Sequence, residues 1–206
     1  MISKLHFITQ GSTSEQHITQ IKQACACGAD WVQLRMKNFD DETLLKTAEQ
    51  ARTITNSYQA KLIINDHFQI VQAVKADGVH LGKNDACPET VRAILGSDFI
   101  IGGTANTLAD CQNLIEKQVD YIGLGPFRFT ETKSNLSPIL GLEGYQFILK
   151  NISKPMPVIA IGGITTEDLP ELLKTRIYGV AMSGTIIEDF NCISEIKQSF
   201  NTPPKQ

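Results

Sequence analysis

The chain contains 206 residues, of which 42% are hydrophobic and 20% are charged, and this composition excludes a disordered, collagen-like or low-complexity chain. Nineteen basic and twenty-two acidic residues give a net charge of −3. No global basic field is available for nucleic acid or an anionic membrane, so we expect neither as a partner, and anionic ligands would have to be held by local groups.

The apolar stretches of the sequence are too short to cross a membrane. One of the longest, residues 155–164, is interrupted by Pro and Gly and falls far short of the roughly 20 residues that a bilayer requires. The N-terminal residues 1–16 lack the extended apolar region of a signal peptide. The cysteines are odd in number and form no CxxC pair, which favours reduced thiols. We therefore expect a cytoplasmic protein.

Eight short apolar runs alternate with longer amphipathic segments along the chain. Such alternation indicates a parallel sheet whose strands are connected by helices. The predicted strands span residues 5–9, 31–35, 61–65, 78–82, 99–103, 121–125, 157–163 and 179–184. Helical spacing of apolar residues, with Ser14 as a candidate N-cap of the first helix, predicts helices within residues 14–29, 40–54, 87–96, 107–118 and 166–175.

The spacing of these elements predicts an α/β fold: a single (β/α)8 TIM barrel over residues 1–206, with a flexible tail at about 200–206. Eight βα units in about 200 residues is the minimum size of this fold. An open, doubly wound sheet is the alternative, but the short spacing between most strands leaves little room for it. The exception is the stretch after the sixth strand, where residues 126–142 show no periodicity, and we expect this long loop to be functional.

Polar residues gather where the predicted strands end, which is where barrel enzymes place their active sites. Gln33, Arg35 and Lys37 follow one another at alternate positions and so share one face of the second strand. Arg binds phosphate oxygens bidentately and Lys adds a point charge, so this row suits a ligand with several phosphate oxygens. The alternative is an exposed strand end with salt bridges.

Two carboxylates, Asp66 and Asp85, follow the third and fourth strands. Hard oxygen ligands of this kind are what Mg2+ prefers when it also binds substrate phosphates, so we predict a magnesium site. In the alternative interpretation, each aspartate caps the helix that follows it. His67 and His80 lie nearby, and we interpret both as structural.

Two further groups of residues favour an anionic ligand. The long loop carries hydroxyl and ammonium groups over residues 130–135, which are suited to closing over such a ligand. Gly162 and Gly163 follow the seventh strand, and Ser183 and Gly184 follow the eighth, where barrels frequently bind phosphate through backbone N–H groups. Two anion sites in one barrel suggest an enzyme that joins or rearranges two phosphorylated small molecules.

Seven segments together resemble the thiamine phosphate synthase family, in the right order and over about residues 5 to 190. The most specific of them is GLGP followed by TxTK. The segments are QLRMK (33–37), IIND (63–66), ADGVHLGKND (76–85), IGGTANT (101–107), DYIGLGPFRFTETK (120–133), IAIGGI (159–164) and GVAMSG (179–184).

The resemblance implies a (β/α)8 barrel and a transferase that condenses 4-amino-5-hydroxymethyl-2-methylpyrimidine diphosphate with a (carboxy)thiazole phosphate. It implies one Mg2+ per subunit, held by Asp66 and Asp85, and a dissociative substitution in which Arg35, Lys37 and Lys133 stabilise the leaving diphosphate. Carried over position by position, it assigns the pyrimidine diphosphate to Gln33, Arg35, Lys37, Asn65, Thr104 and Lys133, and the thiazole phosphate to Thr130, Glu131, Thr132, Gly163, Ser183 and Gly184. Leu34 and Met36 are also expected among the substrate-binding residues.

Two other functions stay open at this point. A thiazole tautomerase of the same superfamily would bind only the thiazole phosphate, and a non-catalytic paralogue would bind phosphate ligands without turnover. The intact row of Arg35, Lys37, Asp66 and Asp85 argues against both. The chain departs from the family where Ser183 precedes Gly184, so at this position the backbone contacts to phosphate are the ones that carry over. Small molecules are the expected partners, and a homo-oligomer is possible.

Overall fold

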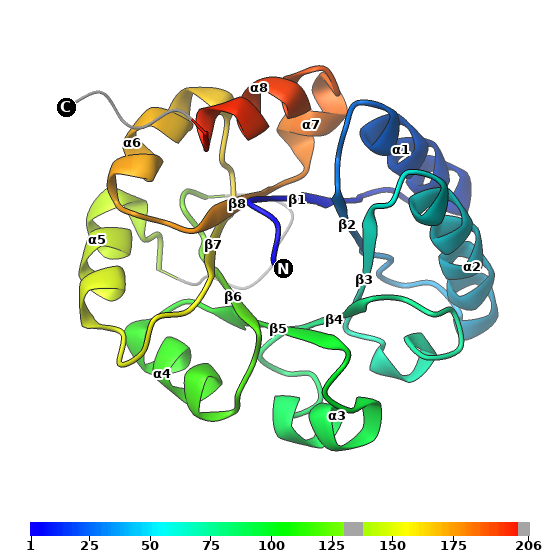
Figure 1. Ribbon diagram of the computed structural model, residues 1–206, viewed down its shortest axis with the longest axis horizontal. Helices are drawn as coiled ribbons and strands as arrows, with labels where there is room; N and C mark the ends of the chain where they lie inside the picture. The colour runs from blue at the N-terminus through cyan, green and yellow to red at the C-terminus, as the bar shows by residue number, and fades with distance from the viewer. Residues whose placement is uncertain (130–137, 202–206) are drawn as a thin grey trace.

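Eight parallel strands close into a barrel in chain order, with helices around the outside (Figure 1). The computed structural model describes residues 1–129 and 138–201. All eight predicted strands are confirmed, and the alternative of an open sheet is wrong because Leu5 of the first strand pairs with Val180 of the eighth. The strands are β1 (Leu5–Ile8), β2 (Trp31–Leu34), β3 (Lys61–Asn65), β4 (Gly78–Leu81), β5 (Ile100–Ala105), β6 (Tyr121–Leu124), β7 (Val158–Ile161) and β8 (Gly179–Met182).

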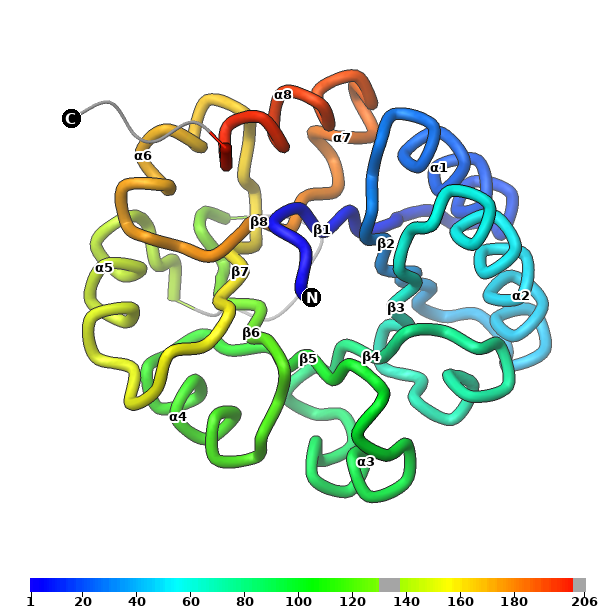
Figure 2. The backbone as a smooth tube through the Cα atoms, in the orientation of Figure 1, coloured from blue at the N-terminus to red at the C-terminus, as the bar shows by residue number. Residues whose placement is uncertain are grey.

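The helices form an outer ring around these strands, as the tube in Figure 2 also shows. Each of the five predicted segments contains a helix. The helices α5, α7 and α8 are additional: α5 starts at a glycine and α7 is a single turn, so neither offered a clear pattern in the sequence. The helices are α1 (Ser14–Ala26), α2 (Asp41–Ser57), α3 (Pro88–Leu95), α4 (Leu108–Glu116), α5 (Gly141–Asn151), α6 (Leu169–Lys174), α7 (Gly184–Glu188) and α8 (Cys192–Ser199), with 3-10 turns η1 (Phe68–Ile70) and η2 (Thr166–Asp168).

Local capping explains where the two clearest helices begin. Thr13, rather than the predicted Ser14, is the N-cap of α1, and its side chain and that of Gln16 form a reciprocal capping box. Thr107 and Asp110 form the same arrangement at the start of α4.

No helix within residues 1–129 and 138–201 is both long enough and apolar enough to span a bilayer.

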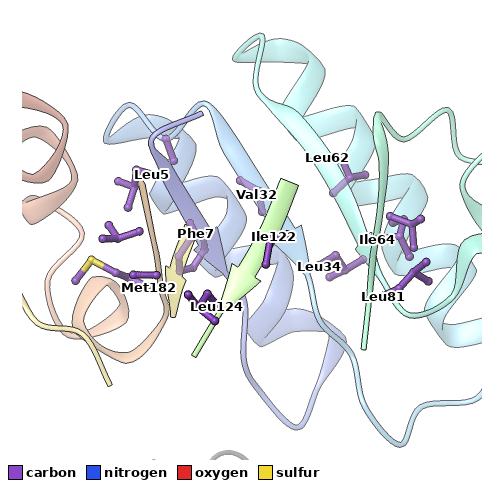
Figure 3. Close-up of a cluster of buried hydrophobic side chains, with 14 of the residues drawn as sticks. Leu5, Phe7, Val32, Leu34, Leu62, Ile64, Leu81, Ile122, Leu124 and Met182 are labelled. Atoms are coloured by element: carbon purple, nitrogen blue, oxygen red, sulfur yellow. The ribbon is translucent and has the colours of Figure 1, made fainter. Parts of the chain in front are cut away.

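Alternate residues of the strands build two separate cores. Outward-facing residues such as Phe7, Leu34 and Leu62 pack against the helices in one large cluster. Figure 3 shows part of it, with Ile64 of β3 beside Leu81 of β4. The inward-facing residues form a smaller second cluster inside the barrel: Ile8, Trp31, Ile63, Tyr121, Ile159 and Ala181. Side chains therefore fill the inside of the barrel, and a ligand would bind at its rim.

Aspartates hold the strands together at the rim where the strands begin. Asp77, immediately before β4, accepts hydrogen bonds from the backbone N–H of Leu62 (2.8 Å) and from Arg52 (2.6 Å), and pairs with Lys61 (3.2 Å). Burial alone would raise the pKa of the Asp77 carboxyl, but these three partners hold it below its ordinary value. Asp77 thus links β3, the start of β4 and α2 at this end of the barrel.

We expect Asp77→Asn to lower the free energy of unfolding by about 2 kcal/mol at neutral pH, because Arg52 loses its charged partner. The folded-state pKa lies below the reference value of 3.8, so the stabilisation is present above that pH and is lost as the pH falls through the lowered pKa. Urea unfolding at pH 7 and at about pH 3 should show the difference shrink in acid. Asp98→Asn, an exposed aspartate before β5, is the control and should change neither curve.

Candidate active site

The predicted donor row lies at the rim where the strands end. Gln33 points into the barrel from β2, is 3% exposed, and donates from Nε2 to Asn65 Oδ1 of β3 at 2.8 Å. Arg35 follows just beyond the end of β2 and is half-buried, whereas Lys37 is exposed. Burial lowers the pKa of Arg35 and Asp66 opposes that change, so the guanidinium stays charged. The structure thus brings these groups to one rim.

Thr9 fixes the backbone of this row and was not anticipated from the sequence. Its N–H donates to the carbonyl of Gln33 at 3.0 Å, and its Oγ1 accepts from the N–H of Arg35 at 3.1 Å. The fully buried His17 of α1 contacts the same oxygen through Nδ1 at 2.7 Å. A Thr directly after β1 was visible in the sequence, but its partner lies 26 residues away, which no local pattern specifies.

We expect Thr9→Val to weaken the binding of inorganic diphosphate about five-fold, because the Arg35 N–H loses its acceptor and the donor row loosens. Isothermal titration calorimetry measures this, and Thr9→Ser should restore the affinity. Thr13→Val removes a comparable hydroxyl from the α1 N-cap and should cost about 1 kcal/mol of stability without changing diphosphate binding. Equal affinities for wild type and Thr9→Val would exclude this role.

Asp66 and Asp85 meet at the ends of β3 and β4. Their carboxyl groups are hydrogen-bonded to each other, and Asp85 Oδ2 also accepts from the N–H of Gly82 at 2.6 Å. A Cβ on Gly82 would lie 2.7 Å from Asp85 Oδ2 and 3.9 Å from Asp66 Oδ1, so glycine makes room for both carboxylates. The structure therefore confirms that the two acids share one place.

The backbone of Asp66 explains how two consecutive residues reach the same rim. Asp66 has φ of 64°, in the left-handed region, and its N–H extends the ladder to the carbonyl of His80 at 2.9 Å. In a regular strand, Asn65 and Asp66 would face opposite sides. The left-handed turn breaks the alternation, and such strained residues cluster at functional sites.

The charge balance at this pair is set by burial and by three neighbouring groups. Burial, the hydrogen bond to Asp85 and the charge of Asp85 raise the pKa of Asp66 to about 6, while Lys37 and Arg35 act in the opposite direction. The raised pKa shows that ionising both carboxyl groups together is unfavourable. A bound cation would stabilise the pair when both are ionised. They cap no helix: His67 is the N-cap of η1 and Cys87 that of α3, so the capping alternative is wrong.

The predicted site residues on β5 and around the end of β2 differ in the direction of their side chains. Thr104 points inward near the end of β5, and its Oγ1 lies 3.0 Å from Nε2 of His80. The structural interpretation of His80 therefore holds for its packing, but it also touches a predicted site residue. Leu34 and Met36 are buried in the outer cluster, so their side chains point away from the rim and only their backbone could meet a ligand there.

The glycine-rich ends of β7 and β8 form the second predicted anion site. Gly163 is exposed with φ of 68°, and Gly184 begins α7, where an added Cβ would meet no atom within 4 Å. The Ser183 hydroxyl donates to the carbonyl of Ile8 at 2.6 Å, so its proton is already engaged. Backbone N–H groups are thus the donors available to a phosphate here.

The remaining predicted residues, Thr130, Glu131, Thr132 and Lys133, lie outside the described residues. The described start of their loop is fixed to β7: the N–H of Phe127 donates to the carbonyl of Ile161 at 2.9 Å, and that of Arg128 to the carbonyl of Gly162 at 3.1 Å. Arg128 also pairs with Asp168 at 2.5 Å. The loop therefore leaves the barrel beside the glycine-rich end of β7.

The chain is similar to one family of known proteins over most of its length. The family model described as thiamine monophosphate synthase matches residues 5–186. A thiamine-phosphate synthase of Flavobacterium johnsoniae is 48% identical over 91% of this chain and 90% of that relative, and one of Phocaeicola vulgatus is 43% identical over 96% and 97%. Among solved structures, thiamine phosphate pyrophosphorylase from Pyrococcus furiosus is 28% identical with a TM-score of 0.81, over 96% of this chain and 93% of that one.

Proposed function

The chain belongs to the thiamine monophosphate synthase family, and we propose that its rim joins a pyrimidine diphosphate to a thiazole phosphate, releasing diphosphate. The observation that carries the assignment of residues is the contact between Asp66 and Asp85, which lies within reach of the charges of Arg35 and Lys37. The enzyme is a transferase, as its relatives' names imply.

The cations at the end of β2 have the central role in this proposal. Negative charge accumulates on the diphosphate as its bond to the pyrimidine methylene carbon breaks. Arg35 and Lys37, with Lys133 from the loop, stabilise that charge more in the transition state than in the bound substrate. The methylene cation that remains is captured by the thiazole nitrogen. No protein nucleophile takes part, and the residues of the rim orient the two substrates.

A magnesium ion fits the two carboxylates. Asp66 and Asp85, whose carboxyl groups interact, would be its protein ligands. Within residues 1–129 and 138–201, no group of three or more His, Cys, Asp and Glu side chains could hold a metal. Mg2+ commonly uses one or two carboxylates and completes its shell with substrate phosphates and water. When bound, the ion would neutralise charge on the diphosphate. We propose one ion per subunit.

The thiazole phosphate is assigned to the opposite side of the rim. Backbone N–H groups near Gly163 and Gly184 would bind the phosphate, and Thr130, Glu131 and Thr132 of the loop would contact the remainder. The engaged hydroxyl of Ser183 supports a backbone contact over a side-chain contact. The two phosphorylated substrates would thus approach from β2 to β4 and from β7 to β8.

The test is an assay of purified protein with pyrimidine diphosphate, thiazole phosphate and Mg2+, with and without EDTA. We expect thiamine phosphate that disappears on chelation and returns with added Mg2+. Folded protein that binds thiazole phosphate but forms no product would favour the tautomerase or the non-catalytic paralogue. Cytoplasmic location, a single domain over residues 1–206 and a homo-oligomeric state stay predictions.

A further inference from the structure

Three side chains from adjacent strands form a connected path from the barrel core to the rim. Tyr121, at the start of β6, places its hydroxyl 3.0 Å from Nδ1 of His80 in β4. Nε2 of the same ring lies 3.0 Å from Oγ1 of Thr104, near the end of β5. Tyr121 is 1% exposed and His80 is 7% exposed, whereas Thr104 is half-buried. The path therefore begins in the core and ends at the proposed pyrimidine site.

Two glycines on the neighbouring strands make the space for this path. A Cβ on Gly102 would lie 2.2 Å from Cζ of Tyr121, and a Cβ on Gly123 would lie 3.0 Å from Cε1 of His80. Neither glycine has a positive φ, so both are required for room and not for backbone conformation. Any side chain at Gly102 would displace the phenol ring from its contact with His80.

The protonation of Tyr121 determines the direction of its hydrogen bond with His80. Burial keeps the Tyr121 phenol neutral by raising its pKa far above the ordinary value. Within the described parts of the chain, Nδ1 of His80 is the one hydrogen-bond partner of that phenol. A buried hydroxyl proton without an acceptor is costly, so Tyr121 donates to Nδ1.

The tautomer of His80 then determines the direction of its hydrogen bond with Thr104 at the rim. Because Nδ1 accepts, the neutral imidazole carries its proton on Nε2 and donates it to Oγ1 of Thr104. The oxygen of Thr104 is thereby used as an acceptor, and its own proton, which no residue within 1–129 and 138–201 accepts, can point toward the ligand.

We propose that Tyr121 and His80 are positioning residues that fix Thr104 as a hydrogen-bond donor, so that the site selects a ligand carrying a lone pair at that point. An unprotonated nitrogen of a pyrimidine ring satisfies this requirement, and a C–H or N–H at the same place does not. The assignment rests on the proposed function, because that function places the pyrimidine at Thr104.

The first test determines the proton position directly. In 15N NMR spectra of labelled protein, His80 should show a protonated Nε2 and an unprotonated Nδ1. Tyr121→Phe keeps the ring but removes the donor to Nδ1, and should shift the ring toward the tautomer protonated on Nδ1. A wild-type ring that is protonated on Nδ1 would overturn the proposal, whether or not the protein forms thiamine phosphate.

The second test measures what the path does for the substrate. Thr104→Val and Tyr121→Phe should each raise KM for the pyrimidine diphosphate about tenfold and change KM for the thiazole phosphate less than two-fold. Because both act through one hydroxyl, the double variant should be no worse than Thr104→Val, and Thr104→Ser should retain the wild-type value. Additive effects in the double variant, or equal changes in both KM values, would overturn the path.

A matched control separates this effect from general loss of stability. Tyr145 is equally buried, but its hydroxyl donates to the carbonyl of Leu124 at 2.5 Å on the helix side of the barrel. Tyr145→Phe should lower the melting temperature and leave the ratio of the two KM values unchanged. If wild type forms no product at all, the proposed function fails, while the NMR measurement still decides the proton path.

Discussion

Asp66→Asn and Asp85→Asn should each lower kcat/KM for thiamine phosphate formation by about a thousandfold, because each variant removes one of the two carboxylates that would hold Mg2+. The loss should persist at saturating Mg2+ if both oxygens are needed. Initial rates over a Mg2+ titration measure this. Asp110→Asn is the control, since Asp110 pairs with Lys83 at 2.6 Å near the same rim and has no proposed metal role.

The stability of these variants provides an independent check. Burial and Asp85 raise the pKa of Asp66 to about 6, above the reference value of 3.8, so ionising this carboxyl costs stability as the pH rises from 3.8 to about 6, and the full cost persists above pH 6. Asp66→Asn removes that charge and should raise the melting temperature of metal-free protein at pH 8. A lower melting temperature together with lost activity would indicate a structural carboxylate and contradict the metal assignment.

Arg35→Gln should lower kcat/KM for the pyrimidine diphosphate by about a thousandfold, because a half-buried, permanently charged guanidinium group is replaced by a neutral amide. KM for that substrate should rise and kcat should fall, whereas KM for the thiazole phosphate should stay within two-fold. Arg35→Lys keeps the charge without the bidentate geometry and should recover part of the loss. Steady-state kinetics with each substrate varied in turn measures both.

The control for the Arg35 variants lies at the other end of the barrel. Arg92 of α3 pairs with Asp120 at 2.6 Å, and Asp120 also accepts from the N–H of Ile101 at 2.7 Å. Arg92→Gln should lower the melting temperature and leave kcat unchanged. An Arg35→Gln enzyme that loses only stability, as Arg92→Gln should, would exclude Arg35 from diphosphate binding.

The barrel was predictable from the sequence because its strands are short apolar runs in regular alternation with helices. The observed N-cap of α1 lies one residue before the predicted one. Thr13 and Ser14 are both acceptable caps, and only the contact with Gln16 selects Thr13. The helix α5 was missed because Gly141 and Gly144 interrupt the apolar pattern.

The candidate site was predictable to the extent that alternation along a strand holds. Gln33 and Thr104 face inward, as that alternation requires. Leu34 and Met36 face outward by the same rule. Asp66 meets Asp85 because its left-handed backbone breaks the alternation, which the sequence did not indicate. The contacts of Thr9 and of Tyr121 could not be predicted, because each joins residues more than 20 positions apart through a geometry that exists only in the closed barrel.

The pairing of β1 with β8 also sets the order in which the protein becomes complete during synthesis. Ser183 bonds to Ile8 across 175 residues, and Tyr178 bonds to Ile2 across 176. Until the last fifth of the chain leaves the ribosome, β1 has one unpaired edge, a surface prone to non-native pairing. The residues proposed for the diphosphate on β2 to β4 are synthesised well before β8, whereas the thiazole side needs Ser183 and Gly184 directly after β8. Closure of β1 against β8 is therefore also the step that completes the thiazole side.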